Sequence, residues 1–295
     1  MKNGKILVAA FYRFAPFDDY ASWQPSLKSL CETGGVLGSI LLAPEGVNGT
    51  IAGSPEAVRT VVGSLHSDKR FADMAVKESW CDATPFVRMK VRLKREIVPL
   101  GVGVDLAATG IRVRPEDWND LIASPGIVAI DTRNDYEIEI GTFPGSINPG
   151  VASFRDFTSW VDGNADLDRD TPIAMFCTGG IRCEKASAYM REQGFSKVYQ
   201  LDGGILNYLA SVSEDESTWQ GSCYVFDRRV AVDASLRSAD HEICVSCNRV
   251  LKAGDRALPG YQEGVTCDAC HRTTSPQRKR RFQERQRQLR QARLS

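Results

Sequence analysis

The chain has 295 residues, 42% of them apolar and 25% charged, and its 37 basic and 37 acidic side chains give a formal net charge of zero. This composition excludes a largely disordered protein and provides apolar side chains for two or three separate cores. No run approaches the roughly 18 apolar residues of a membrane helix, and the start of the chain leads into a strand-like run rather than a signal peptide. We therefore expect a soluble, cytoplasmic, multidomain α/β protein.

Residues 1–100 are predicted to form a ferredoxin-like (acylphosphatase-like) α+β domain. A buried strand is expected over residues 5–14, and apolar residues recur at helical spacing over 22–33. The stretch GSILLAPEGVNGTIAGS has apolar runs around Glu-Gly and Asn-Gly turn dipeptides, which predicts a hairpin. A second helix begins at Pro55, and RMKVRLKREIVPL supplies the last strand. The resulting order, βαββαβ, is typical of the ferredoxin-like fold.

Residues 107–213 are predicted to form a second domain with a parallel sheet. The segments GIVAIDTRNDYE and TPIAMFC contain short buried strands that end near Asp131 and at Cys177, and FSKVYQLDGG supplies a further strand. Helical patterns separate these strands, which indicates a parallel α/β sheet whose ligand site lies beyond the carboxyl ends of the strands. Cys177 lies at such an end, and Asp131 and Arg133 are predicted to support it.

The segment MFCTGGIRCEK predicts a reactive cysteine. A cysteine between a strand end and a helix start lies near unpaired backbone N–H groups and the positive end of the helix dipole, which favour the thiolate. Gly179 and Gly180 let the loop curl so that its N–H groups point inward, and Arg182 adds a positive charge. The alternative, an inert buried cysteine, explains neither the glycines nor the arginine. We predict Cys177 as the nucleophile within an anion-binding loop formed by Thr178, Gly179, Gly180 and Ile181.

Two further features of this loop bear on its chemistry. Cys183 is predicted to act as a resolving thiol, able to form a disulfide with Cys177 or to accept its persulfide. A cysteine phosphatase needs an arginine six positions after the nucleophile, but here that position is Cys183 and Arg182 comes at five. The smaller loop favours a sulfur atom over a phosphoryl group.

Residues 214–275 are predicted to form a zinc-binding segment. Two Cys-x-x-Cys pairs are separated by nineteen residues, a spacing at which two knuckles can hold one ion tetrahedrally. In a chain without a secretion signal such pairs indicate a metal site in a reducing compartment rather than a disulfide framework. His241 and His271 are possible substitute ligands. The predicted ligands of this structural zinc are Cys244, Cys247, Cys267 and Cys270.

Residues 276–295 form a basic tail with eight Lys or Arg and one Glu, which leaves 29 basic and 36 acidic side chains in the rest of the chain. Good helix formers, with no Gly or Pro after Pro276, favour a helix. Contact with RNA and a solubilising or docking role are both open. The candidate RNA-binding residues of the tail are Arg278, Lys279, Arg280 and Arg281. The strand segment RMKVRLKR is a second basic candidate.

The segment CTGGIRCEKA, with DTRNDYEIEIGTFPGSINP before it and VYQLDGGI after it, resembles the rhodanese domain, in which such a loop carries a persulfide on its cysteine. The segments ILLAPEGVNGTIAGS, MKVRLKREIV, GSCYVFDRRVAV and RFQERQRQ are similar to the oxygen-dependent tRNA uridine hydroxylase family, and this resemblance covers nearly the whole chain. It implies that the wobble uridine, position 34 in the anticodon loop, is converted to 5-hydroxyuridine with dioxygen and an electron donor.

Three classes of function therefore remain open. The first is a tRNA uridine hydroxylase that uses Cys177, Arg182 and Cys183; the second is a sulfurtransferase that passes a persulfide from Cys177 to an acceptor. The third is a zinc-bearing RNA-binding adaptor without catalysis. No Gly-rich dinucleotide fingerprint follows a strand, and three histidines leave little room for a two-His iron centre, so no flavin, nicotinamide or iron site is expected.

Overall fold

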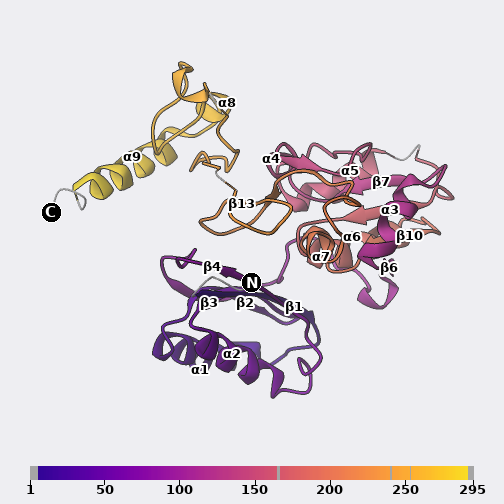
Figure 1. Ribbon diagram of the computed structural model, residues 1–295, viewed down its shortest axis with the longest axis horizontal. Coiled ribbons are helices and arrows are strands. Elements are labelled where there is room, and N and C mark those ends of the chain that lie inside the picture. The colour runs from indigo at the N-terminus through magenta and orange to yellow at the C-terminus, as the bar shows by residue number, and fades with distance from the viewer. Residues whose placement is uncertain (1–5, 165–166, 240, 253, 292–295) are drawn as a thin grey trace.

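The computed structural model describes residues 6–164, 167–239, 241–252 and 254–291. Figure 1 shows three parts along the chain: an N-terminal sheet with two helices on one face, a second part built of alternating strands and helices, and a smaller C-terminal part that ends in a long helix. Among the described residues, no helix combines the length and the apolar character needed to cross a membrane.

The N-terminal part is a five-stranded sheet covered on one face by two helices. Its elements are β1 (Ile6–Phe14), α1 (Tyr20–Thr33), β2 (Leu37–Ala43), β3 (Gly46–Gly53), α2 (Pro55–His66), β4 (Val76–Cys81) and β5 (Met89–Leu93). The strand order is β4-β1-β3-β2-β5, and α1 and α2 lie together on the outer face of the sheet in Figure 1. The Ser54 side chain accepts a hydrogen bond from the backbone N–H of Ala57 and so caps α2. This sheet confirms the predicted ferredoxin-like fold.

One strand of this sheet differs from the sequence prediction. The βαββαβ order is completed by β4 and not by the segment RMKVRLKREIVPL, of which only β5 is a strand. β4 pairs with β1 at one edge, whereas β5 is an additional strand that pairs in parallel with β2 at the other edge. The sequence of β4, VKESWC, has no buried position among its six residues. Its apolar pattern is therefore too weak to predict a strand.

Alternation along β1 gives the sheet two different faces. Leu7 and Phe11 are buried under the helices, so Tyr12 is directed to the opposite face. The register pairs Ala10 with Lys77 of β4, which places Lys77 on the same face as Tyr12. This face, free of helices, is turned toward the second part of the chain in Figure 1.

The second part is a parallel sheet with helices on both faces, as predicted. Its elements are β6 (Ile111–Val113), α3 (Pro115–Ala123), β7 (Val128–Asp131), α4 (Asp135–Ile138), β8 (Gly141–Thr142), α5 (Phe157–Gly163), β9 (Ile173–Phe176), α6 (Ile181–Glu192), β10 (Val198–Leu201) and α7 (Gly204–Ser211). The four-stranded sheet has the order β6-β10-β9-β7. All four residues of β9 are buried. Ile173 and Met175 pack in the core that includes α5 and α6, while Ala174 and Phe176 pack in the core that includes α3 and α7.

The C-terminal part consists of short strands, loops and the basic helix. Its elements are β11 (Gln220–Gly221), β12 (Cys223–Tyr224), β13 (Ala231–Val232), α8 (Asp268–His271) and α9 (Pro276–Gln291). Short 3-10 turns elsewhere span Leu106–Ala108, Phe154–Asp156 and Asp255–Ala257. Strand β11 pairs with β8, and Cys223 of β12 packs in the same core as Phe176, so the segment after α7 adds to the second part.

Candidate active site and metal centre

Cys177 directly follows β9, and three residues separate it from α6, so its sulfur lies where a strand end meets a helix start. The backbone N–H of Gly180 donates a hydrogen bond to Cys177 Sγ at 3.1 Å. Gly180 has a φ of 95°, a left-handed conformation that favours glycine and curls the loop around the sulfur. A Cβ on Gly204, the first residue of α7, would lie 2.4 Å from the carbonyl oxygen of Cys177, so only glycine lets the start of α7 pack on the loop.

The electrostatic environment favours the thiolate of Cys177. Burial alone would raise its pKa, but the hydrogen bond from the Cys183 thiol, the charge of Arg182 and backbone N–H groups at the start of α6 outweigh burial and lower the pKa to about 6. Cys183 responds in the opposite direction, because burial and the neighbouring Cys177 raise its pKa well above the usual thiol value. The Cys183 thiol also lies 3.6 Å from the hydroxyl of Thr132. Of the two thiols, Cys177 is the one that ionises.

Arg182 is held by a buried carboxylate that the sequence did not single out. Both terminal guanidinium nitrogens donate to the carboxylate oxygens of Glu137, each at 2.7 Å. Neither side chain is more than 8% exposed, and the ring of Phe226, which is 63% exposed, lies 5.7 Å from the guanidinium carbon. The bidentate pair fixes Arg182 beside the loop, so its charge acts on Cys177 from a set position. Glu137 belongs to α4 and completes a capping box with Asn134.

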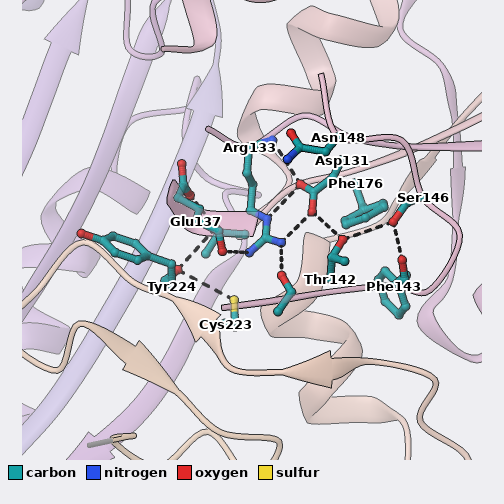
Figure 2. A network of polar contacts seen from close by, with 12 residues as sticks. Asp131, Arg133, Glu137, Thr142, Phe143, Ser146, Asn148, Phe176, Cys223 and Tyr224 are labelled. Carbon is teal, nitrogen blue, oxygen red and sulfur yellow. Dashed lines mark hydrogen bonds and ion pairs between the residues drawn. The ribbon is translucent and has the colours of Figure 1, made fainter. Parts of the chain in front are cut away.

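Asp131 and Arg133 form the second buried ion pair of the site (Figure 2). Arg133 Nε and Nη2 donate to the two carboxylate oxygens of Asp131 at 2.9 and 2.6 Å, and both side chains are buried. The same guanidinium donates to the backbone carbonyls of Glu137, at 3.4 Å, and Gly141, at 2.6 Å. The Thr142 hydroxyl donates to Asp131. The pair therefore holds the segment that carries Glu137, which in turn pairs with Arg182 beside Cys177.

The helix-free face of the N-terminal sheet covers the loop through Lys77, and Tyr12 on the same face contacts α6; the sequence singled out neither residue. The ammonium of Lys77 donates to the carbonyl of Gly179 at 2.6 Å and also to the carbonyl of Gly203. The Tyr12 hydroxyl donates to Glu184 of α6 at 3.3 Å. Cys177 is 0% exposed as a result of this covering and of its own loop. The pairing of β4 with β1 is what places Lys77 on this face, and that pairing can be recognised only once β4 is known to be a strand.

The four cysteines of the two Cys-x-x-Cys pairs lie together, and their sulfur atoms all fall within 4.8 Å of one another. Sulfur–sulfur distances of 3.7 Å (Cys244–Cys270), 3.6 Å (Cys247–Cys267) and 3.8 Å (Cys267–Cys270) occur in the cluster. A tetrahedral zinc with ligands at about 2.3 Å requires sulfur atoms about 3.8 Å apart, so the cluster fits this ion. The histidines have other partners: His241 contacts Ser222, and His271 contacts Thr266.

Helix α9 packs on the metal-binding part through one side. The guanidinium of Arg278 donates to the carbonyl of Ser246, between the first pair of cysteines, at 2.6 Å. Phe282 is buried, and Arg290 forms an ion pair with Glu263. Arg280 and Arg281 are also exposed and form no ion pair among the described residues, and the Arg281 guanidinium carbon lies 5.7 Å from the centre of the Phe282 ring. The helix therefore has a docking side, which includes Arg278, and a free cationic side.

Comparisons with known proteins find relatives that match nearly the whole chain. A family model described as the UPF0176 acylphosphatase like domain matches residues 6–97, and the rhodanese-like domain model matches residues 114–211. A tRNA uridine(34) hydroxylase of Acaryochloris marina is 48% identical over 287 residues, covering 97% of this chain and 93% of that protein. One of Sinorhizobium medicae is 48% identical over 288 residues, covering 97% and 91%. The solved rhodanese-like domain from Anabaena sp. shares 18% identity over 37% of this chain and 78% of that chain, with a TM-score of 0.31. With near-complete mutual coverage and almost half of the residues identical, this chain belongs to the tRNA uridine(34) hydroxylase family.

Proposed function

We propose that this protein hydroxylates C5 of the wobble uridine of tRNA, with Cys177 as the catalytic thiol and dioxygen as the source of the new oxygen atom. The observation that carries this proposal is the full-length similarity to the tRNA uridine(34) hydroxylases, which includes the metal-binding segment as well as the rhodanese-like part. The lowered pKa of Cys177, at about 6, supports the role of a nucleophile at neutral pH. Arg182 holds the charge that stabilises the thiolate, and Asp131 and Arg133 support the segment that positions Arg182.

The thiolate has a defined task in such a reaction. Uracil is electron-poor at C6, so Cys177 Sγ can form a bond to C6 and move an electron pair toward C5 and the O4 carbonyl. Dioxygen then delivers one oxygen atom to C5, while two electrons and two protons from a separate donor convert the other atom to water. Loss of the C5 proton and departure of the thiolate restore the aromatic base. Because Cys177 is buried, the contacts of Lys77 and Tyr12 must loosen before a base can enter.

A rhodanese-type sulfurtransferase is the second candidate, and the loop itself favours it, because the N–H groups that stabilise a thiolate would equally stabilise a persulfide on Cys177. Cys183, next to Cys177 and protonated, is positioned to accept sulfur or to form a disulfide. Nucleoside mass spectrometry of tRNA from cells with and without the gene separates the candidates. A hydroxylase adds one oxygen atom to a uridine, a tRNA sulfurtransferase adds sulfur, and an adaptor changes no nucleoside.

The four-cysteine cluster is expected to hold one structural zinc per chain. Four thiolates close the coordination sphere, so the ion contributes to folding and offers no position for substrate. Elemental analysis of reduced, freshly purified protein should give about one zinc per chain, and Cys247→Ser should lower both the zinc content and the helical circular dichroism. Cys81→Ser, a cysteine outside the cluster, should change neither. Zinc far below one equivalent in the unmodified protein would contradict the assignment.

The free cationic side of α9 is proposed to contact tRNA phosphates in the anticodon region. Replacing Arg280 and Arg281 with glutamine should weaken tRNA binding and reduce the slope of log K against log salt by roughly 0.7 to 0.9 for each arginine–phosphate interaction that is removed. Fluorescence anisotropy with labelled tRNA over a range of salt concentrations measures both quantities. Lys279, half-buried on the same helix, is expected to contribute less than these two.

Variants of Arg278 and of Arg59, a basic residue on α2, serve as comparisons for the tRNA-binding test. Replacing Arg278 should weaken the docking of α9 as well as any phosphate contact, because its guanidinium bonds Ser246. Arg59 lies on α2, which faces away from the rest of the chain in Figure 1, so Arg59→Gln should leave tRNA affinity unchanged. If the Arg280 and Arg281 double variant keeps both the affinity and the salt slope, α9 is a docking element only.

A further inference from the structure

Lys77 contacts the active-site loop from outside the rhodanese-like part of the chain. Its side chain extends from β4 of the N-terminal sheet and donates to the carbonyls of Gly179 and Gly203. Gly179 lies 102 positions away along the chain, between Cys177 and α6. The ammonium thus joins the nucleophile loop to the glycine turn that packs on it.

The peptide unit between Gly179 and Gly180 connects Lys77 directly with the sulfur. This unit is planar and trans, so its carbonyl oxygen and its N–H hydrogen point in opposite directions. The oxygen accepts from Lys77 at 2.6 Å, and the N–H donates to Cys177 Sγ at 3.1 Å. An ammonium on the oxygen withdraws electron density from the amide and strengthens its N–H as a donor, as expected for chained hydrogen bonds. Lys77 therefore fixes both the direction and the donor strength of the N–H that meets the sulfur.

The positive charge of Lys77 also lies in a part of the molecule where little water is present to screen its interaction with Cys177. Burial lowers the pKa of Lys77, and the charge of the nearby Cys177 thiolate opposes that effect. Several other titratable groups surround the two thiols or Lys77. They are Tyr12 on β1, Glu137 on α4, Arg182, Cys183 and Glu184 on α6, Asp202 after β10 and Cys223 on β12. Arg182 shares its charge with Glu137, and Lys77 is a second cation beside the sulfur.

We propose that Lys77 is a positioning residue of the active site, which orients the Gly179–Gly180 peptide and stabilises the Cys177 thiolate from the N-terminal domain. The inference rests on Cys177 being the reacting thiol, as proposed above. It gives the N-terminal domain a part in the chemistry, since closure of this domain on the loop completes the environment of the nucleophile. An open arrangement, in which a base can enter, would leave Cys177 with a higher pKa until the domain closes again.

The test is the pH dependence of Cys177 alkylation by iodoacetamide in the full-length protein, followed by peptide mass spectrometry. The apparent pKa reports thiolate stability, whereas the rate at high pH reports access to the buried sulfur. In the unmodified protein the apparent pKa should be about 6. Lys77→Met should raise it by about one unit, so that alkylation at a pH below both values becomes about tenfold slower. Lys77→Arg keeps the positive charge, so the apparent pKa of Cys177 in this variant should stay close to that of the unmodified protein.

A matched control separates the charge from the domain contact. Tyr12→Phe removes the hydroxyl contact with Glu184 across the same interface without changing a charge, so it should alter only the rate at high pH. If Lys77→Met fails to fold, the apparent pKa of Cys177 is measured in Lys77→Gln, which keeps a hydrogen-bond donor but carries no charge. An apparent pKa that stays the same in the neutral Lys77 variants, with only the high-pH rate changed, would overturn the proposal. Because alkylation needs no tRNA, the result stands apart from the nucleoside analysis that tests the hydroxylase activity.

Discussion

Cys177→Ser should reduce formation of 5-hydroxyuridine by at least about a thousandfold, the scale of loss seen when an enzyme loses its nucleophile. Serine has nearly the size of cysteine and keeps the position at the end of β9, but its hydroxyl does not ionise near neutral pH. The loop N–H groups and the charge of Arg182, which lower the thiol pKa to about 6, would then have no anion to stabilise. Quantitative mass spectrometry of tRNA nucleosides after incubation with purified protein, dioxygen and a reductant measures the loss.

Cys31→Ser and Cys183→Ala are the comparisons for this experiment. Cys31 is buried in the core of the N-terminal part, far in the sequence from the loop, and its replacement controls for the loss of any buried thiol. Cys183→Ala tests the resolving role separately: loss of its hydrogen bond to Cys177 should slow every turnover to the same degree, whereas loss of a resolving thiol should lower repeated turnover further under oxidising conditions. A Cys177→Ser variant with full activity would remove Cys177 from the reaction and leave the loop with a structural role.

The Cys177 loop can be recognised from sequence because everything that builds it is local. The strand end, the two glycines and the start of α6 lie within a few residues of one another, and each has a known conformational preference. The zinc cluster is predictable for the same reason, since each Cys-x-x-Cys pair forms one knuckle and only the joining of two knuckles is tertiary. Short-range geometry is therefore enough to locate both features.

The partners of the loop cannot be recognised in that way. Glu137 precedes Arg182 by 45 residues, and its only local signal is the capping box with Asn134, which predicts a helix start and not an ion pair. Lys77 lies farther still, on a strand whose polar, half-buried sequence carries little strand signal. The role of Lys77 arises from the register of β4 on β1 and from the contact of the N-terminal sheet with the loop, and the role of Glu137 arises from the contact of α4 with Arg182 of α6. Such contacts depend on packing between distant segments, for which a single sequence carries no periodic pattern.

Glu137→Gln should lower the free energy of unfolding of the rhodanese-like part by about 3 to 5 kcal/mol, the cost of removing one partner from a buried ion pair. Glutamine keeps the size of the side chain and an oxygen that can cap α4, but it leaves the guanidinium of Arg182 without a counter-charge at a site only 8% exposed. Urea unfolding followed by tryptophan fluorescence reports this part of the chain through Trp118 and Trp219 in its core, once Trp23 and Trp80, which pack on the N-terminal core, are replaced by phenylalanine. The double variant Glu137→Met with Arg182→Met should recover much of the stability, since an apolar pair of similar volume needs no desolvation of charge. The same double variant should nevertheless raise the apparent pKa of Cys177, because the guanidinium that stabilises the thiolate is gone. A loss of less than about 1 kcal/mol in Glu137→Gln, the range of an exposed salt bridge, would show that water reaches Arg182 and that Glu137 does not fix it beside the loop.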